Sequence, residues 1–173
     1  MTSKLWLFIS QGQEDAKASS HALLSRAVKA YFAAVGEAQE PVLRSSEGKP
    51  YFPSGKHFLS VTHTHGLYLA AFAPFPMGLD AEREDTVRSR VRSRYFTEEE
   101  KALPFAYVWT AREAVGKLAG KGLSDALSAE VKGETVCLHG KDYELRTVPV
   151  AGYVVTLCTE EGETFGIQTL SEK

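Results

Sequence analysis

The chain has few cysteines, little net charge and no long hydrophobic run, and each shortage excludes a class of protein. Its 173 residues include two cysteines, Cys137 and Cys158, which lie far apart and outside any Cys-x-x-Cys spacing. Both fall in apolar, strand-like stretches, so we expect buried thiols rather than a disulfide or a metal site. The formal net charge of −2 gives no basis for wholesale electrostatic binding to nucleic acid or to an anionic membrane.

Long apolar stretches are missing as well. The apolar run at residues 5–9 is too short for the core of a signal peptide, and no uninterrupted apolar stretch is long enough to span a bilayer. We therefore expect a cytoplasmic location and no membrane partner. Hydrophobic residues make up 43% of the chain and charged residues 24%, which is the ordinary balance of a globular protein with its own core.

Apolar periodicity divides the chain into two parts. Residues 4–9 predict a buried first strand, and apolar residues at helical spacing predict a helix over residues 16–35 that ends at Gly36. The Pro-Phe-Pro segment at residues 74–76 is a natural boundary. We therefore predict an α+β protein with two halves, residues 1–76 and 77–173. The further strands expected are residues 41–44, 58–62, 67–72, 77–81, 134–138, 143–150, 153–158 and 164–169, the last four of them antiparallel.

Three carboxylates and a lysine in the second half are the candidate site residues. Asp80 and Glu82 lie two residues apart after an apolar run, and in an extended strand their side chains point to the same side. A helix predicted to run from Pro104 to about residue 119 carries Glu113 and Lys117 one turn apart. Such a set is suited to hold a hard divalent cation against a phosphate.

Ordinary structural roles compete with this interpretation. Asp80 and Glu82 are also suited to surface ion pairs, because arginines follow them in the sequence. Glu113 and Lys117 are also a common helical pair, worth about 0.2–0.5 kcal/mol when exposed.

Segments spread over residues 48–123 resemble, in order, those of the 4′-phosphopantetheinyl transferases. The chain is most similar to a short member of the larger, surfactin-type branch of that family. The segments are Gly48-Lys49-Pro50, Thr62-His63-Thr64-His65-Gly66-Leu67, Gly78-Leu79-Asp80-Ala81-Glu82, Arg94-Tyr95-Phe96-Thr97-Glu98-Glu99-Glu100, Trp109-Thr110-Ala111-Arg112-Glu113-Ala114-Val115-Gly116-Lys117 and Gly120-Lys121-Gly122-Leu123.

The resemblance implies a fold, a reaction and partners. The fold would be a pseudo-dimer of two similar α+β halves with the site in the cleft between them, which we expect to be an active monomer. The reaction would transfer 4′-phosphopantetheine from coenzyme A to a serine of an acyl or peptidyl carrier protein. By the same resemblance, magnesium is held by Asp80, Glu82 and Glu113. Glu113 also deprotonates the serine, directly or through water, and Lys117 contacts the phosphates and assists the leaving group.

The resemblance also assigns coenzyme A contacts in the first half. Lys49 lies near the nucleotide and phosphates, and His63 is the phosphate contact, because Thr-His-Thr-x-Gly fits the family spacing better with His63 than with His65. The basic N-terminal segment that grips the 3′-phosphate in the surfactin-type branch has almost no room here. The residues that remain as substitutes, none matched by a motif, are Lys17, His21 and Arg44.

Other charged residues near these segments have two interpretations. Glu100 matches an acidic position of the family, but a capping box with Thr97 also explains it. Arg112 replaces a more usual lysine, which preserves the charge but not the geometry. The arginine-rich residues 83–94 form either a solvated face or a basic surface for an acidic carrier protein.

Two alternative functions use the same residues. One is a non-catalytic module that binds coenzyme A or a carrier protein. The other is a different magnesium-dependent phosphoester enzyme, such as a nuclease, which would use the carboxylates but not the Gly-Lys-Pro and histidine segments.

Overall fold

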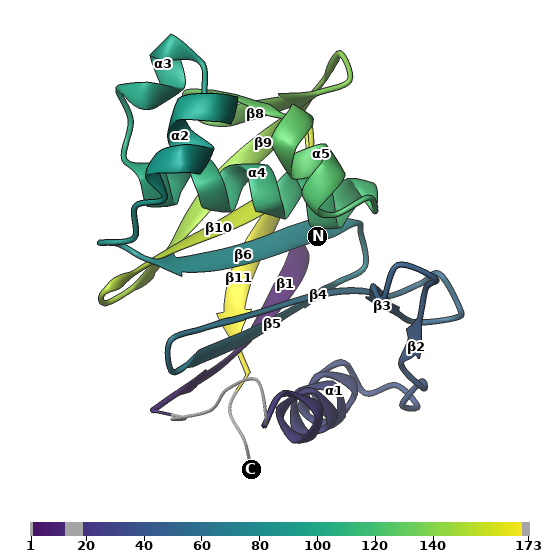
Figure 1. Ribbon diagram of the computed structural model, residues 1–173. Helices are drawn as coiled ribbons and strands as arrows, with labels where there is room; N and C mark the ends of the chain where they lie inside the picture. The colour runs from purple at the N-terminus through teal and green to yellow at the C-terminus, as the bar shows by residue number, and fades with distance from the viewer. Residues whose placement is uncertain (1, 13–18, 171–173) are drawn as a thin grey trace. The chain divides into compact units, whose positions relative to one another are not determined.

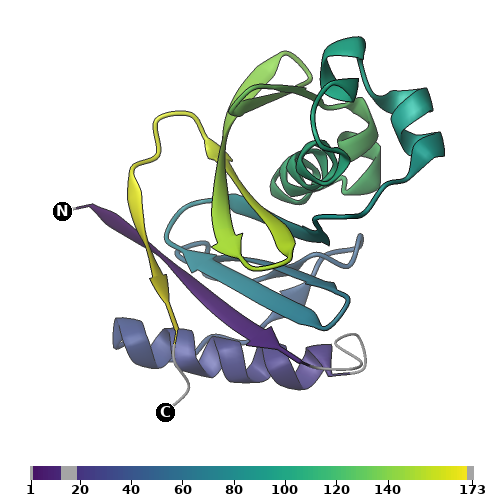
Figure 2. The same cartoon turned by 90° about the vertical axis from the view of Figure 1, so that its left-hand side faces the viewer.

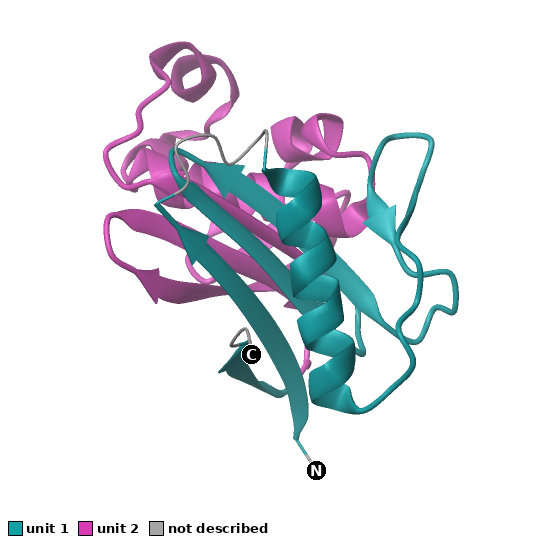
Figure 3. Cartoon of the chain, turned by 90° about the horizontal axis from the view of Figure 1, so that it is seen from below, with its two compact units in different colours: residues 1–76, 164–173 teal, residues 77–163 magenta. Residues whose placement is uncertain are grey.

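The computed structural model describes residues 2–12 and 19–170 and has a mixed α+β fold. Two compact units make up the chain: unit 1 comprises residues 1–76 and 164–173, and unit 2 comprises residues 77–163 (Figure 3). The boundary after Pro76 coincides with the predicted one. Residues 164–173, which we assigned to the second half, belong to unit 1, because strand β11 (Phe165–Thr169) pairs with strand β1 (Ser3–Gln11).

The main sheet of unit 1 has the strand order β11-β1-β5-β4. Strand β5 (Leu67–Ala73) is antiparallel to both β1 and β4 (Phe58–Thr64). Strand β11 runs parallel to β1, so the antiparallel arrangement predicted for this last strand is wrong. Two short strands, β2 (Leu43–Arg44) and β3 (Pro50–Tyr51), form a separate antiparallel ribbon.

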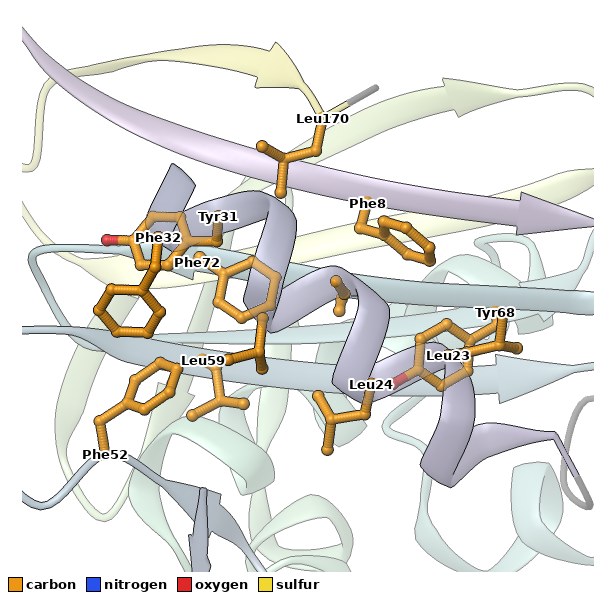
Figure 4. Packing of buried hydrophobic residues seen from close by; sticks show 13 residues of the cluster. Phe8, Leu23, Leu24, Tyr31, Phe32, Phe52, Leu59, Tyr68, Phe72 and Leu170 are labelled. Atoms are coloured by element: carbon orange, nitrogen blue, oxygen red, sulfur yellow. The ribbon is translucent and has the colours of Figure 1, made fainter. Parts of the chain in front are cut away.

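Helix α1 (Ser20–Val35) packs on this sheet and forms the core of unit 1 (Figure 4). Its buried residues recur every three or four positions, and Tyr31 stacks on Phe72 of β5 with ring centroids 4.8 Å apart. Each large side chain buried in this way contributes about 1.5–3 kcal/mol. The helix ends at Gly36 as predicted, with a φ of 72° that glycine adopts without steric cost. The predicted first residues of the helix, 16–18, lie outside the described residues.

The sheet of unit 2 has the strand order β6-β10-β9-β8-β7 (Figure 1), and every neighbouring pair is antiparallel. All of its strands except β7 were predicted; β7 is three residues long, too short for alternation to identify. The strands are β6 (Met77–Arg83), β7 (Glu130–Lys132), β8 (Thr135–Leu138), β9 (Lys141–Val150) and β10 (Tyr153–Glu160).

Helix α4 (Phe105–Ala119) packs on this sheet and forms the core of unit 2. Val108 and Val115 are fully buried on the side that faces the strands. Figure 2 shows the sheet curving around the helix, which is seen nearly end on. The helix begins after Pro104 and ends at Gly120, as predicted. Within the described residues, no helix has the length and apolar character needed to cross a membrane.

Three shorter helices complete unit 2. Helix α2 (Ser89–Tyr95) has no buried residue, which agrees with a solvated face over this arginine-rich segment. Helix α3 (Glu98–Lys101) begins with the predicted capping box: the Glu100 amide donates to Thr97 Oγ1, and the Thr97 amide donates to the Glu100 carboxylate. Helix α5 (Leu123–Ser128) was not predicted.

Candidate functional site

Strand β6 carries Asp80 and Glu82 on the side that faces α4. The cross-strand neighbour of Asp80 is Thr156, whose hydroxyl lies 2.8 Å from that of Thr110 on α4, which identifies this side. The competing interpretation of Asp80 and Glu82 as surface carboxylates is wrong, since both side chains are buried. Because the strand continues to Arg83, Asp80 is 8% exposed and Glu82 is 6% exposed. Burial raises the free-energy cost of keeping both carboxyl groups ionised unless cations lie beside them.

Gly78 allows β6 and α4 to approach this closely. A Cβ atom at Gly78 would overlap the backbone carbonyl oxygen of Ala114, so any other residue would push the helix away from the strand. Gly116 is restricted in the same way by the carbonyl oxygen of Gly122. Gly78 therefore sets the distance between the strand that carries two carboxylates and the helix that carries the third, whereas Gly116 sets the distance between α4 and the start of α5.

Lys117 reaches from α4 to the strand. Its Nζ donates to Asp80 Oδ1 over 2.9 Å and to the backbone carbonyl of Leu79 over 3.0 Å. The Lys117 side chain is 28% exposed, so this ion pair is partly hydrated. Lys117 is therefore directed to β6 and does not form a simple surface pair with Glu113.

Glu82 is held by the segment that follows β6. Arg88 donates from one terminal nitrogen to Glu82 Oε2 over 3.0 Å, and the Thr86 hydroxyl donates to Glu82 Oε1 over 3.4 Å. The guanidinium of Arg88 also lies over the Trp109 ring of α4, 5.6 Å from its centroid. Glu82 thus forms the ion pair with a following arginine that the competing interpretation predicted, although its carboxylate is buried.

Glu113 belongs to the same charged cluster. Burial raises the pKa of the Glu113 carboxyl above its ordinary value, and the Asp80 and Glu82 carboxylates raise it further. The Lys117 ammonium and the Arg88 guanidinium act in the opposite direction. Helical spacing puts Trp109, Glu113 and Lys117 on one stripe of α4. Glu113 therefore lies between Arg88, which contacts Trp109, and Lys117. A further positive charge at this position would favour the ionised form of the Glu113 carboxyl.

These carboxylates have the donor chemistry that suits magnesium. Asp80, Glu82 and Glu113 offer hard oxygen ligands whose mutual repulsion a dication would relieve. In the structure, protein cations already lie against two of them. Among the described residues, no three His, Cys, Asp or Glu side chains are gathered as a preformed metal site. The metal assignment therefore stays a prediction, supported by the ligand type and by the clustering of charge.

Arg112 and Glu100 have a structural role on the other side of α4. Arg112 donates from Nε and from a terminal nitrogen to the two Glu100 oxygens over 3.0 and 2.6 Å. The same guanidinium donates to the backbone carbonyls of Tyr95, Ala126 and Leu127. Both side chains are almost completely buried, so the pair joins α3, α4 and α5 rather than facing a ligand.

The predicted coenzyme A contacts lie in unit 1. His63 is an exposed residue of β4, directly opposite Tyr68 of β5, so both project to the same face. Tyr68 is buried in the core beneath α1, which puts His63 on the α1 side of the sheet. His65 lies in the turn after β4 with a φ of 34°. Only His63 is therefore held by strand pairing.

Lys49 precedes β3, and its amide donates to the Ser45 hydroxyl. Partial burial lowers the pKa of the Lys49 ammonium. Among the substitutes for the basic segment, Arg44 donates to the carbonyl of Gly48, His21 is exposed on α1, and Lys17 lies outside the described residues. The cleft expected between the halves stays a prediction.

Arg88 and Trp109 are the site residues whose roles the sequence did not indicate. Arg88 was one arginine in a run assigned to a solvated face or to partner binding. It lies beyond the end of β6, in the segment that leads to α2, where neither strand nor helix periodicity applies, so only the path of the chain shows the contact. Trp109 was noted within its segment, and its stacking against an arginine has no sequence signal.

No protein-family model matches this chain, and no match was found among curated proteins.

Proposed function

We propose that the protein transfers 4′-phosphopantetheine from coenzyme A to a serine of an apo acyl or peptidyl carrier protein, as a magnesium-dependent holo-carrier-protein synthase. The observation that carries this proposal is the clustering of Asp80 and Glu82 from β6 with Glu113 and Lys117 from α4. Support also comes from Gly78, since it explains in physical terms why the Gly-x-Asp-x-Glu segment begins with glycine.

Each residue has a role in the proposed reaction. The serine oxygen attacks the phosphorus that is joined to pantetheine, and the bond from that phosphorus to the bridging oxygen of the diphosphate breaks. Glu113 takes the serine proton, directly or through water. Lys117 lies beside Asp80, where its ammonium stabilises negative charge on the departing adenosine 3′,5′-bisphosphate. Asp80, Glu82 and Glu113 would hold magnesium, which would neutralise the charge of the diphosphate.

The proposal includes the pseudo-dimer fold. Each unit by itself has an antiparallel pairing of strands covered by one long helix, α1 with 16 residues and α4 with 15. Lys49 and His63 of unit 1 would then contact coenzyme A in an active monomer. The exposed arginines of α2, Arg90 and Arg94, are available to an acidic carrier protein through attraction that salt weakens.

The test is the mass of apo carrier proteins after incubation with coenzyme A, magnesium and the enzyme. We expect the addition of one phosphopantetheine group and the release of adenosine 3′,5′-bisphosphate. Asp80→Asn, which keeps the shape of the side chain, should lose the transfer. Glu84→Gln is the matched control, because it removes an exposed carboxylate two residues beyond Glu82 and should retain the transfer.

The alternative functions predict different outcomes in the same assay. Binding of coenzyme A without any transfer would indicate a binding module. Magnesium-dependent cleavage of DNA or RNA, with coenzyme A left intact, would indicate another phosphoester enzyme that uses the same carboxylates.

A further inference from the structure

The ion pair between Glu82 and Arg88 is unequal in its exposure to water. The Glu82 side chain is 7% exposed, whereas the Arg88 side chain is 49% exposed. The Glu82 carboxylate is fixed in β6. Arg88 lies in the segment between β6 and α2 and reaches the carboxylate with its long side chain. The guanidinium can therefore return to water at low cost, and the carboxylate cannot.

Arg88 also has a second contact that does not involve Glu82. Its guanidinium lies over the ring of Trp109, with 5.6 Å to the centroid, and Trp109 is itself 5% exposed. A cation over an indole face is attracted by about 0.5–1 kcal/mol when partly hydrated. The arginine therefore has a partner on α4 that remains in place if the carboxylate is taken by another cation.

From these contacts we propose that Arg88 is an internal counter-ion that competes with the divalent cation for Glu82. The inference rests on the proposed function, which makes Glu82 a metal ligand. Without metal, the guanidinium neutralises the buried carboxylate and keeps the cluster folded. When the metal binds, Glu82 exchanges the guanidinium for the dication, and Arg88 shifts against Trp109. Arg88 thereby sets the metal concentration at which the site becomes competent.

The proposal is tested by direct binding of Mn²⁺, measured from the free-ion signal in electron paramagnetic resonance. Removing the competitor in Arg88→Ala should tighten Mn²⁺ binding about twofold to fivefold, the range expected for a half-exposed ion pair. Arg88→Gln, which keeps part of the side chain over Trp109, should show the same direction.

The matched control is Arg83→Ala. Arg83 adjoins Glu82 in the sequence, is 48% exposed and pairs with Asp85 instead. Its removal changes the net charge by the same amount, so it reports the general effect of one fewer positive charge. A gain in Arg83→Ala as large as that in Arg88→Ala would overturn the competition.

A second measurement follows the movement of Arg88. In a Trp6→Phe background, Trp109 is the remaining tryptophan. Added Mg²⁺, which does not itself quench fluorescence, should change the Trp109 emission, and Arg88→Ala should abolish that change. If saturating Mg²⁺ leaves the Trp109 emission of the Trp6→Phe protein unchanged while Arg88 is present, the arginine does not move.

The outcomes separate the two proposals. If Mn²⁺ binds the wild type and carrier proteins are modified, but Arg88→Ala binds Mn²⁺ no more tightly, only the role of Arg88 is overturned. If the wild type neither binds Mn²⁺ nor modifies any carrier protein, the proposed function fails together with this inference.

Discussion

Helix α4 contacts carboxylates on two sides, and the two contacts differ in how completely the charges are enclosed. On one side, Glu100 accepts from Arg112, from its own capping partner and from the Val131 amide, and neither charged side chain is more than 2% exposed. On the other side, Asp80 and Glu82 are buried but their cations are partly hydrated. A saturated pair fixes a structure, whereas a carboxylate with an exchangeable cation is suited to bind a ligand.

The largest effect is expected from breaking the saturated pair. Arg112→Met leaves the Glu100 carboxylate buried without its main cation, which should lower the free energy of unfolding by about 3–5 kcal/mol. Urea denaturation measures the change. Arg88→Ala, the corresponding change at the half-exposed pair, should cost less, about 1–3 kcal/mol, because the buried Glu82 carboxylate loses its cation but keeps the Thr86 hydroxyl as a donor. Similar losses in the two variants would show that the comparison is wrong.

The next largest effect is expected at the contact that brings the strand and helix together. Gly78→Ala forces a methyl group against the fixed backbone of Ala114, which should cost about 1–3 kcal/mol and move Glu113 away from Asp80. Thermal unfolding and transfer activity should both fall. Gly166→Ala is the control, because open space surrounds that strand glycine; a loss there of equal size would contradict the role of close approach.

Replacing a site carboxylate should separate activity from stability. Asp80→Asn removes the charge that faces Lys117, but the ammonium remains partly hydrated, so the change in stability should stay within about 1 kcal/mol. Transfer activity should nevertheless be lost, since a metal ligand is neutralised. Retained magnesium-dependent activity in a folded Asp80→Asn protein would remove Asp80 from the site.

The last expected change is a gain in stability. Because the pKa of Glu113 is raised in the folded protein, the folded state is favoured when Glu113 is protonated; that contribution is present below the unfolded-state pKa and lost as pH rises through the folded-state pKa. Glu113→Gln should therefore stabilise the protein at neutral pH, by about 0.5–2 kcal/mol. Unfolding curves from pH 7 to pH 4 should show the gain disappearing; a gain independent of pH would mean that charge is not its cause.

Local sequence signals predicted the parts of the fold that local physics determines. Gly36 marked the end of α1, Pro104 marked the start of α4, and Thr97 with Glu100 marked the start of α3, because backbone conformation and capping act over a few residues. Alternation along β6 likewise predicted that Asp80 and Glu82 share a face.

The remaining features depend on contacts between distant residues. Nothing in residues 165–169 indicates that β11 pairs in parallel with β1, since alternation is the same in both arrangements. Helix α5 begins at Leu123, after Gly122, which offers no side-chain cap, and it has only six residues. The burial of Asp80 and the contact of Arg88 with Glu82 follow from the path of the chain, which the spacing of the charged residues does not encode.

The central claim is that the carboxylate cluster of unit 2 performs phosphopantetheine transfer, and Glu113→Gln tests it most directly because this variant should remain folded. The measurement is the mass of an apo carrier protein after incubation with coenzyme A, magnesium and either enzyme. We predict that the wild type adds one phosphopantetheine group and that the folded variant adds none. Equal modification by both enzymes would contradict the account.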